Sequence, residues 1–92
     1  MSQSIYKYEL NLGITTIYVP KGYEVLTAQM QDDRLQVWIK IDSDVNPDQE
    51  LLFEVIGTGH QLAVYSTPMK YVSTVQETNG LYVWHIFYHE VL

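Results

Sequence analysis

Apolar and polar residues alternate along much of this chain with the period of two that is typical of β-strands. The alternation is clearest over Arg34–Ile41, and the run Glu24–Gln31 before it shows a similar pattern. The apolar positions of Arg34–Ile41 are Leu35, Val37, Ile39 and Ile41. Only Asp32 and Asp33 separate the two runs, so we predict a tight turn and a β-hairpin here.

Turn-forming residues divide the rest of the chain into further short runs rich in β-branched and aromatic residues. We predict strands at Ser4–Leu12, Thr15–Val19, Leu51–Ile56, Tyr71–Gln76 and Leu81–Val91. Gly13 is predicted to end the first of these strands, and Pro20 and Gly22 form a turn after the second. Asn79-Gly80 predicts a second hairpin, because both residues accept positive φ.

Two segments lack a strand pattern. Asp42–Asp48 is acidic and contains a proline, and His60–Met69 includes Pro68 near its end. We predict loops for both, with room for one short strand in the second. No stretch shows sustained helical periodicity, an internal repeat or a domain boundary. The pattern therefore predicts a single all-β, mainly antiparallel domain over residues 1–92, with six to seven strands in a sandwich or a partly open barrel.

The last predicted strand, Leu81–Val91, carries large apolar side chains on both of its faces. A strand with one solvated face alternates, whereas a strand that is covered on both faces does not. A chain of 92 residues has few side chains left to form a second cover. We therefore expect a partner subunit to cover this strand, in a dimer or a tetramer, with a central position in the sheet as the alternative.

The composition favours self-association and argues against several kinds of partner. Apolar residues make up 47% of the chain, with eight tyrosines and two tryptophans, and there is no cysteine for a disulfide or a thiolate metal site. The net charge of −6 does not provide the basic surface that a nucleic-acid polymer requires. The N-terminus lacks the apolar core of a signal peptide and no run reaches membrane-spanning length, so we expect a cytosolic protein without membrane contact.

The sequence contains none of the common enzyme motifs, such as a phosphate-binding loop, a nucleophile elbow or a zinc-protease helix. His85 and His89 have the spacing that binds zinc on a helix, but on a strand they stand about 13 Å apart. We interpret them as polar edges of an aromatic surface, with a metal bridge across a subunit interface as the alternative. Asp42, Asp44 and Asp48 lack the glycine and glutamate of a calcium loop and are interpreted as a solvated loop. We therefore expect no catalytic residue, no metal and no cofactor.

Gly57-Thr58-Gly59-His60 is the first candidate binding element. Two glycines that flank a threonine let backbone amides approach an anion closely, and Thr58 and His60 offer further donors. An ordinary turn, in which the glycines only reverse the chain, is the alternative.

Trp38 is the second candidate, because it stands among the polar positions of its strand. An exposed tryptophan is either an interface anchor or a stacking platform for a flat ring. Tyr8 is a further ring for stacking, and Lys7 and Lys40 supply the cations nearby. Solvated surface positions are the alternative for the lysines.

Six stretches follow one another along nearly the whole chain: Ile5-Tyr-Lys-Tyr-Glu-Leu10, Val19-Pro-Lys-Gly22, Trp38, Ile56-Gly-Thr-Gly-His60, Tyr71-Val-Ser-Thr74 and Gly80-Leu-Tyr-Val-Trp-His85. In this order they resemble a family of small proteins from bacteriophages and prophages. That family typically has I-x-K-Y-x-L near its start, I-x-G-T-G-H in the middle and G-x-L-V-x-H near its end. The present chain departs from the family's W-A-L-V-D-P stretch at Trp38–Ser43 and has Trp84 after the closing valine. The family is a domain of unknown function, so the resemblance implies a viral setting and no chemistry.

A viral setting favours proteins that block host defence, and one class of these resembles sponges that sequester a cyclic oligonucleotide or cyclic ADP-ribose signal between subunits. Few cations suffice when the ligand carries one or two phosphates. The hypothesis is a non-enzymatic, homo-oligomeric protein of the host bacterial cytoplasm that sequesters a small anionic, nucleotide-like immune signal. Its binding residues would be Gly57, Thr58, Gly59, His60, Trp38, Tyr8, Lys7 and Lys40. The alternatives are a protein-interaction module that inhibits a host defence protein and a minor virion or assembly component.

Overall fold

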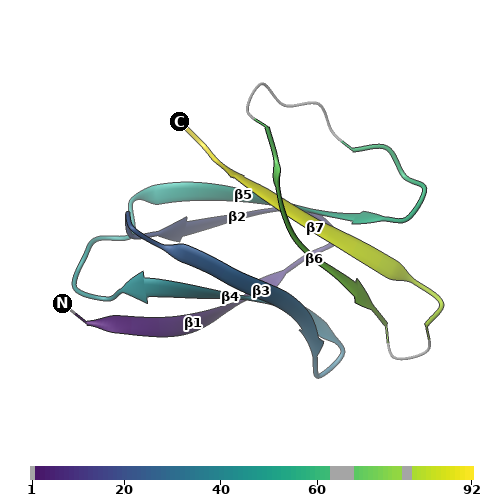
Figure 1. Ribbon diagram of the computed structural model, residues 1–92, viewed down its shortest axis with the longest axis horizontal. Helices are drawn as coiled ribbons and strands as arrows, with labels where there is room; N and C mark the ends of the chain where they lie inside the picture. Colours follow the sequence, from purple (N-terminus) through teal and green to yellow (C-terminus); the bar gives the residue numbers. More distant parts are fainter. Residues whose placement is uncertain (1, 63–67, 78–79) are drawn as a thin grey trace.

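Seven antiparallel strands form two sheets in the computed structural model, which describes residues 2–62, 68–77 and 80–92 (Figure 1). The strands are β1 (Gln3–Leu10), β2 (Gly13–Val19), β3 (Glu24–Gln31), β4 (Arg34–Asp42), β5 (Gln49–Gly57), β6 (Lys70–Gln76) and β7 (Val83–Glu90). One sheet has the strand order β1-β4-β3 and the other β2-β5-β7-β6. The described residues contain no helix, which confirms the predicted all-β, antiparallel class.

The β3–β4 hairpin forms where the alternation predicts it. Asp32 and Asp33 adopt positive φ angles of 53° and 61°, which a two-residue turn between antiparallel strands requires. Every aliphatic residue of the alternating run is buried, and Trp38 is half-buried on the opposite face of the sheet. The local pattern alone was therefore sufficient for this element.

Some predicted strand ends were wrong. β1 stops at Leu10 and Gly13 begins β2, because the Asn11 N–H donates to the Thr15 hydroxyl (3.0 Å) and closes a tight corner between the two strands. β7 begins only at Val83, because the chain before it is used in a turn in which Glu77 N–H donates to the carbonyl of Tyr82 (3.0 Å). The predicted turn residue Asn79 and part of the predicted 60–69 loop lie outside the described residues.

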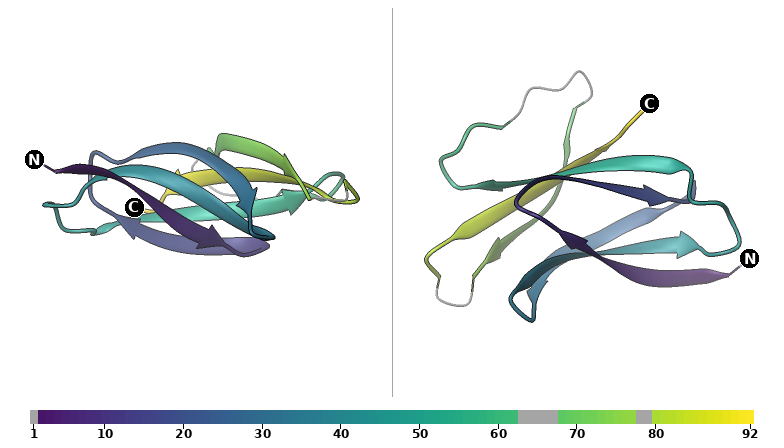
Figure 2. Two further views of the ribbon diagram at one scale, coloured as in Figure 1. Left: turned by 90° about the horizontal axis from the view of Figure 1, so that it is seen from below. Right: turned by 180° about the vertical axis from the view of Figure 1, so that it is seen from behind.

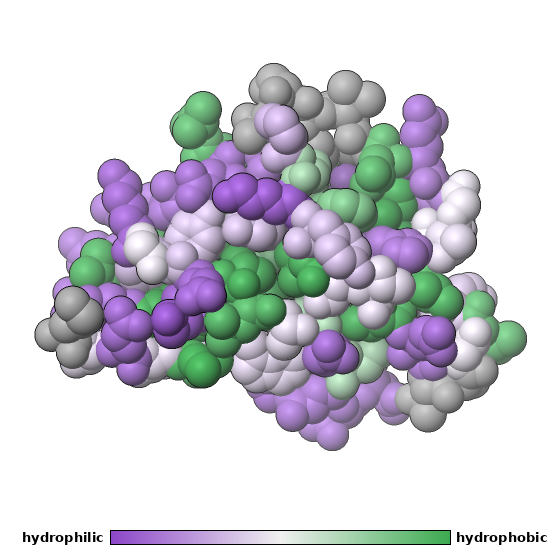
Figure 3. Space-filling model, viewed as in Figure 1, coloured by the Kyte–Doolittle hydropathy of each residue, from purple (hydrophilic) through white to green (hydrophobic). Residues whose placement is uncertain are grey.

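One hydrophobic core fills the space between the two sheets. Val37 and Ile39 from one sheet and Phe53 and Ile86 from the other are fully buried. Tyr88 stacks on Phe53 with ring centroids 5.4 Å apart. Each such side chain stabilises the fold by about 1.5–3 kcal/mol through burial. Seen from the side of β3 and β6, apolar residues gather in a band across the middle of the molecule, with hydrophilic residues around them (Figure 3).

The two sheets meet at one edge, where β3 and β6 lie beside each other (Figure 1). Each of these strands has a register shift there, after Val25 in β3 and after Tyr71 in β6. The buried Ala28 N–H donates to the Ser73 hydroxyl at 2.9 Å, and the Thr27 hydroxyl lies 3.3 Å from the same oxygen. Ser73 therefore links the two sheets by hydrogen bonds at an edge where β3 and β6 form no continuous ladder.

The opposite edge, between β1 and β2, stays open. The two strands belong to different sheets and do not pair along their described lengths (Figure 2). A hollow of about 250 Å³ lies at this edge, and its lining includes Tyr6, Tyr8, Tyr18, Pro20 and Pro47. The domain is thus a two-sheet sandwich that is joined at one edge, and its described strands do not close into a barrel.

β7 lies in the interior of its sheet, with β5 on one side and β6 on the other. Ile86 and Tyr88 on its inner face belong to the core, while on its outer face His89 is buried and Phe87 is half-buried. β7 is therefore a central strand of its sheet, and the cover of its outer face by a partner subunit stays a prediction.

Candidate functional site

The predicted binding residues lie at three places in the molecule. Gly57, Thr58 and His60 line a cavity of about 390 Å³ at one end of the four-stranded sheet. Trp38 lies on the outer face of the other sheet, and Tyr8 lines the hollow at the open edge. Lys7 and Lys40 lie on the same face as Trp38. Within one chain, the structure does not bring these groups into one site.

Gly57 lines the cavity, and the His60 and Trp84 rings lie close to it. It is the last residue of β5 and pairs with Trp84 of β7. After it, Gly59 turns the chain with a φ of 87°, and the His60 ring folds back over Gly57. A Cβ atom at Gly57 would lie 3.3 Å from His60 Nδ1 and 3.3 Å from Trp84 Cζ3. Glycine is therefore the residue that lets both rings lie against the backbone here.

A pair of stacked rings forms one wall of the cavity. Tyr82 and Trp84 lie with their ring centroids 5.9 Å apart and their planes within 14° of parallel. The Trp84 indole N–H donates to Glu77 Oε1 at 3.1 Å, which holds the ring in this position. Tyr82 remains 56% exposed, so it offers a ring face to a flat ligand.

The stretch that contains Tyr82 and Trp84 is visible in the sequence, but these rings are absent from the binding residues that the sequence predicts. They reach the glycine turn only through the pairing of β5 with β7. That pairing joins residues 27 positions apart, so no local pattern shows it. The two-faced apolar run was the one sequence signal that β7 is a central strand.

The polar part of the cavity consists mainly of side chains. Thr58 N–H donates to the carbonyl of Val83 (3.3 Å) and His60 N–H to that of Gly57 (3.1 Å). These two amides are therefore already engaged, and the anion cradle predicted for the turn has to rely on the Thr58 hydroxyl and the His60 imidazole. None of the described lining residues carries a carboxylate, in contrast to the acidic chain as a whole.

A chain of hydrogen bonds extends from Thr58 across the outer face of the sheet. The Thr58 hydroxyl lies 2.7 Å from His85 Nε2, and His85 Nδ1 lies 3.0 Å from the Thr74 hydroxyl. The Tyr71 hydroxyl is in turn 2.8 Å from that of Thr74. When His85 carries its proton on Nε2, it donates to Thr58, and the Thr58 hydroxyl is then able to donate to a ligand. His85 is thus a positioning residue behind the cavity.

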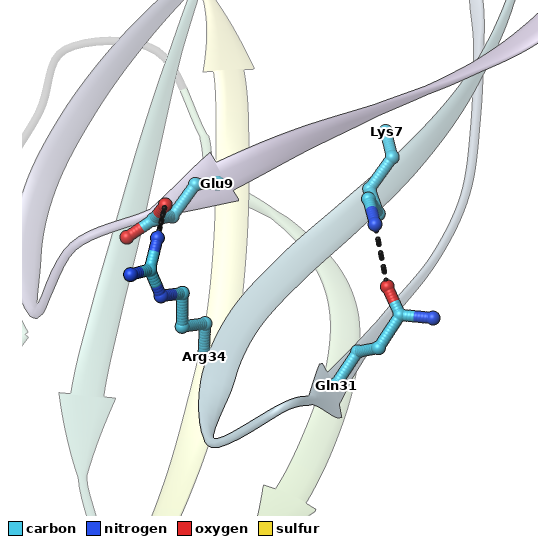
Figure 4. A network of polar contacts seen from close by, with 4 residues as sticks. All are labelled: Lys7, Glu9, Gln31 and Arg34. Carbon is cyan, nitrogen blue, oxygen red and sulfur yellow. Dashed lines mark hydrogen bonds and ion pairs between the residues drawn. The ribbon is translucent and has the colours of Figure 1, made fainter.

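The residues around Trp38 form a different kind of surface. Lys7 and Thr27 flank Trp38 on the neighbouring strands. Lys7 Nζ donates to Gln31 Oε1 at 2.6 Å (Figure 4), and Lys40 Nζ lies 3.1 Å from Glu24. Both lysines are therefore engaged by neighbours of the same sheet.

His85 and Asp42, which belong to the histidine and aspartate sets considered for metal binding, have other roles in the described part of the chain. Asp42 Oδ1 accepts the N–H groups of Asp44 (3.0 Å) and Ser2 (3.2 Å), and these bonds hold the pKa of Asp42 below its ordinary value. His85 binds two threonine hydroxyls, as described above. No group of three histidines, aspartates or glutamates that could hold a metal ion occurs among the described residues.

The fold and the cavity define a small antiparallel β-domain with a ring-walled pocket at one end of its larger sheet. The chain belongs to the family described as Domain of unknown function (DUF7352), whose model matches residues 1–91. No curated protein and no solved structure matches the chain. In the described part of the chain we find no helix with the length and apolar character needed to cross a membrane.

Proposed function

We propose that this protein is a non-enzymatic binding protein that sequesters a small anionic, nucleotide-like ligand in the cavity at Gly57, Thr58, His60, Tyr82 and Trp84. The observation that carries the proposal is the stacked ring pair beside a bare glycine, with a hydroxyl and an imidazole in the same cavity. Its volume of about 390 Å³ is suited to one mononucleotide unit, since small-molecule sites measure roughly 300–1,000 Å³.

The base of the ligand stacks on the exposed ring of Tyr82. Tyr82 is itself supported by Trp84, so the ring is already oriented before the ligand arrives. Preorganisation of this kind lowers the entropy cost of binding. Because every base has a π-face, the ring pair favours flat heterocycles without selecting one base.

The phosphate group binds at the His60 and Thr58 side of the cavity. None of the described lining residues is acidic, and the Glu77 carboxylate beside the cavity accepts the Trp84 indole N–H behind the ring wall. A ligand with one or two phosphates needs only a few charge-assisted or hydroxyl hydrogen bonds. The resemblance to phage proteins favours an immune signal of the host bacterium, of the cyclic oligonucleotide or cyclic ADP-ribose type, as this ligand.

Isothermal titration calorimetry with cyclic dinucleotides, cyclic ADP-ribose and linear ADP-ribose tests the proposal. We expect saturable binding of at least one of these ligands. Tyr82→Ala is expected to weaken it by about 5- to 150-fold, the equivalent of roughly 1–3 kcal/mol for one stacked base. Tyr18→Ala is the matched control, because Tyr18 is also 56% exposed but lies at the open edge.

A second pair of variants tests the polar side of the cavity. Thr58→Val keeps the shape of the side chain and removes the hydroxyl, so we expect a loss of about fivefold to tenfold, equivalent to one hydrogen bond of ~1 kcal/mol. Thr16→Val makes the same change at an exposed position of β2 and is expected to bind normally. The absence of binding heat with every one of these ligands at high micromolar concentration would contradict the proposal. An equal loss of affinity in each variant and its control would contradict it as well.

A further inference from the structure

The outer face of the three-stranded sheet carries an apolar strip that the core does not use. Ile5 is 58% exposed and Leu26 is 40% exposed, and both border a shallow hollow of about 380 Å³ beside the half-buried Trp38. Leu26 lies at the register shift of β3, which adds an apolar side chain to this face. Trp38 stands in the central strand, so the strip crosses the middle of the sheet.

This face is electrically neutral, although the chain is acidic. It carries three cations and three acids: Lys7, Arg34, Lys40, Glu9, Glu24 and Asp42. The remaining two cations and eight acids account for the entire net charge of −6. The local repulsion between two acidic copies is therefore lower when this face is the one that meets, although Asp32 and Asp33 lie in the turn at its end.

Two ion pairs lie on either side of Trp38, and Lys7 lies directly beside Trp38 on the neighbouring strand. Lys40 and Glu24 pair at 3.1 Å on one side of Trp38. Arg34 and Glu9 pair at 3.3 Å on the other side, and Figure 4 shows this second pair. Lys7 also reaches across β4 to Gln31 at 2.6 Å. Each side of Trp38 therefore presents a cation next to an acid.

We propose that two copies of the chain bind each other through this face, with Trp38, Ile5 and Leu26 of each copy at the centre. A two-fold axis brings the same patch of both copies together, so the apolar strips meet and each cation-acid pair faces another such pair. The ligand cavity is on the other sheet and stays accessible in this dimer. The inference does not depend on the proposed function.

The size of the face sets the expected strength of the dimer. Three strands with eight or so residues each cover roughly 14 by 27 Å at the usual strand spacing and rise. Stable dimers bury about 800 Å² per partner, and this face provides less. We therefore expect a dimer that dissociates in the micromolar range.

Sedimentation velocity from about 1 to 500 μM tests the proposal, because this range spans the expected dissociation constant. We expect a reversible monomer–dimer equilibrium. Ile5→Asp places a charge in the apolar strip and is expected to raise the dissociation constant at least about tenfold, the equivalent of ~1.4 kcal/mol. Ile14→Asp is the matched control, because Ile14 is similarly exposed but lies on β2 of the other sheet.

Circular dichroism of each variant shows whether the fold is retained. Should Ile5→Asp fail to fold, Leu26→Gln probes the same strip from the irregular part of β3. If the wild-type protein is a monomer at every concentration, the proposal is overturned, and a different protein becomes the candidate partner for this face. Dissociation by Ile14→Asp but not by Ile5→Asp also overturns it, because the interface then lies on the four-stranded sheet. Ligand titration of monomeric Ile5→Asp separates this result from the proposed function.

Discussion

The two edges of the sandwich are built in different ways. At the joined edge, β3 and β6 lie together and the buried Ser73 hydroxyl accepts the Ala28 N–H of the other sheet. At the open edge, tyrosine and proline rings line a hollow between β1 and β2, where Tyr6 and Tyr18 are largely exposed. Hydrogen bonds thus connect the two sheets at the β3–β6 edge, whereas tyrosine and proline side chains line the β1–β2 edge.

The difference shows where a small number of polar atoms matters. A buried N–H that loses its acceptor imposes the full desolvation penalty, whereas an exposed group exchanges its partner for water. The same substitution should therefore have unequal effects at the two edges. The predictions below test this inequality.

The largest effect is expected for Ser73→Ala. This variant leaves the Ala28 N–H without its acceptor inside the protein, so the free energy of unfolding should fall by about 2 kcal/mol. Ser43→Ala makes the same change beside the open edge, where the hydroxyl donates to the Ser2 carbonyl in an exposed bond. Its effect should stay within about 0.5 kcal/mol. Urea denaturation of both variants measures the difference, and equal effects would refute it.

A smaller effect is expected for Tyr23→Phe. The Tyr23 hydroxyl donates to Glu90 Oε1 at 2.6 Å and links the start of β3 to the end of β7. Its loss should lower the free energy of unfolding by about 1.5 kcal/mol at neutral pH. Tyr8→Phe is the control at the open edge, and we expect it to change the free energy of unfolding less than Tyr23→Phe does.

The same tyrosine predicts a pH dependence. Burial, followed by the hydrogen bond to Glu90, raises the pKa of Tyr23 above its ordinary value of 10. The folded protein therefore holds this proton more tightly than the unfolded chain. The stabilisation is complete below pH 10 and is lost as the pH rises from there toward the raised pKa. The free energy of unfolding of each protein should be compared with its own value at neutral pH. On that scale, the wild type should lose stability at lower pH than Tyr23→Phe as the pH rises above 10.

The smallest effect is expected for Asp42→Asn, next to the open edge. Backbone N–H groups of Asp44 and Ser2 hold the pKa of Asp42 below its ordinary value of 3.8. The stabilisation is therefore present above pH 3.8 and is lost as the pH falls through the lower folded value. Asp42→Asn should show a slightly flatter acid denaturation curve than wild type. Asp48→Asn removes a charge from the same loop and should leave the curve unchanged, so a matching change in both variants contradicts the assignment.

The sequence predicted the features that depend on near neighbours. Alternation over Arg34–Ile41 identified β4 and its buried face, and two aspartates identified the turn before it. The glycine turn after β5 was also predicted, since Gly59 has the positive φ that a turn of this kind needs. These features rest on side-chain period and backbone preference, which are local properties.

Features that depend on strand order could not be predicted in the same way. The approach of Trp84 to Gly57 follows from the pairing of β5 with β7, and the Ser73 link follows from the approach of β6 to β3. Trp38 and the glycine turn were predicted to bind one ligand, but within one chain they lie on different sheets, because β4 pairs with β1 and β3. Nothing in the local pattern ranks one such pairing above another.

Gly57 offers a simple criterion for comparing chains of this family. A Cβ atom at this position would lie 3.3 Å from both the imidazole and the indole. Alanine would therefore require the two rings to move by a few tenths of an ångström, and a bulkier side chain would displace them. Members with a larger residue at the equivalent position should therefore have lost the recess for a flat compound, whatever the rest of their sequence. The residue at this one position would then distinguish chains that are able to bind such a compound from chains that share only the fold.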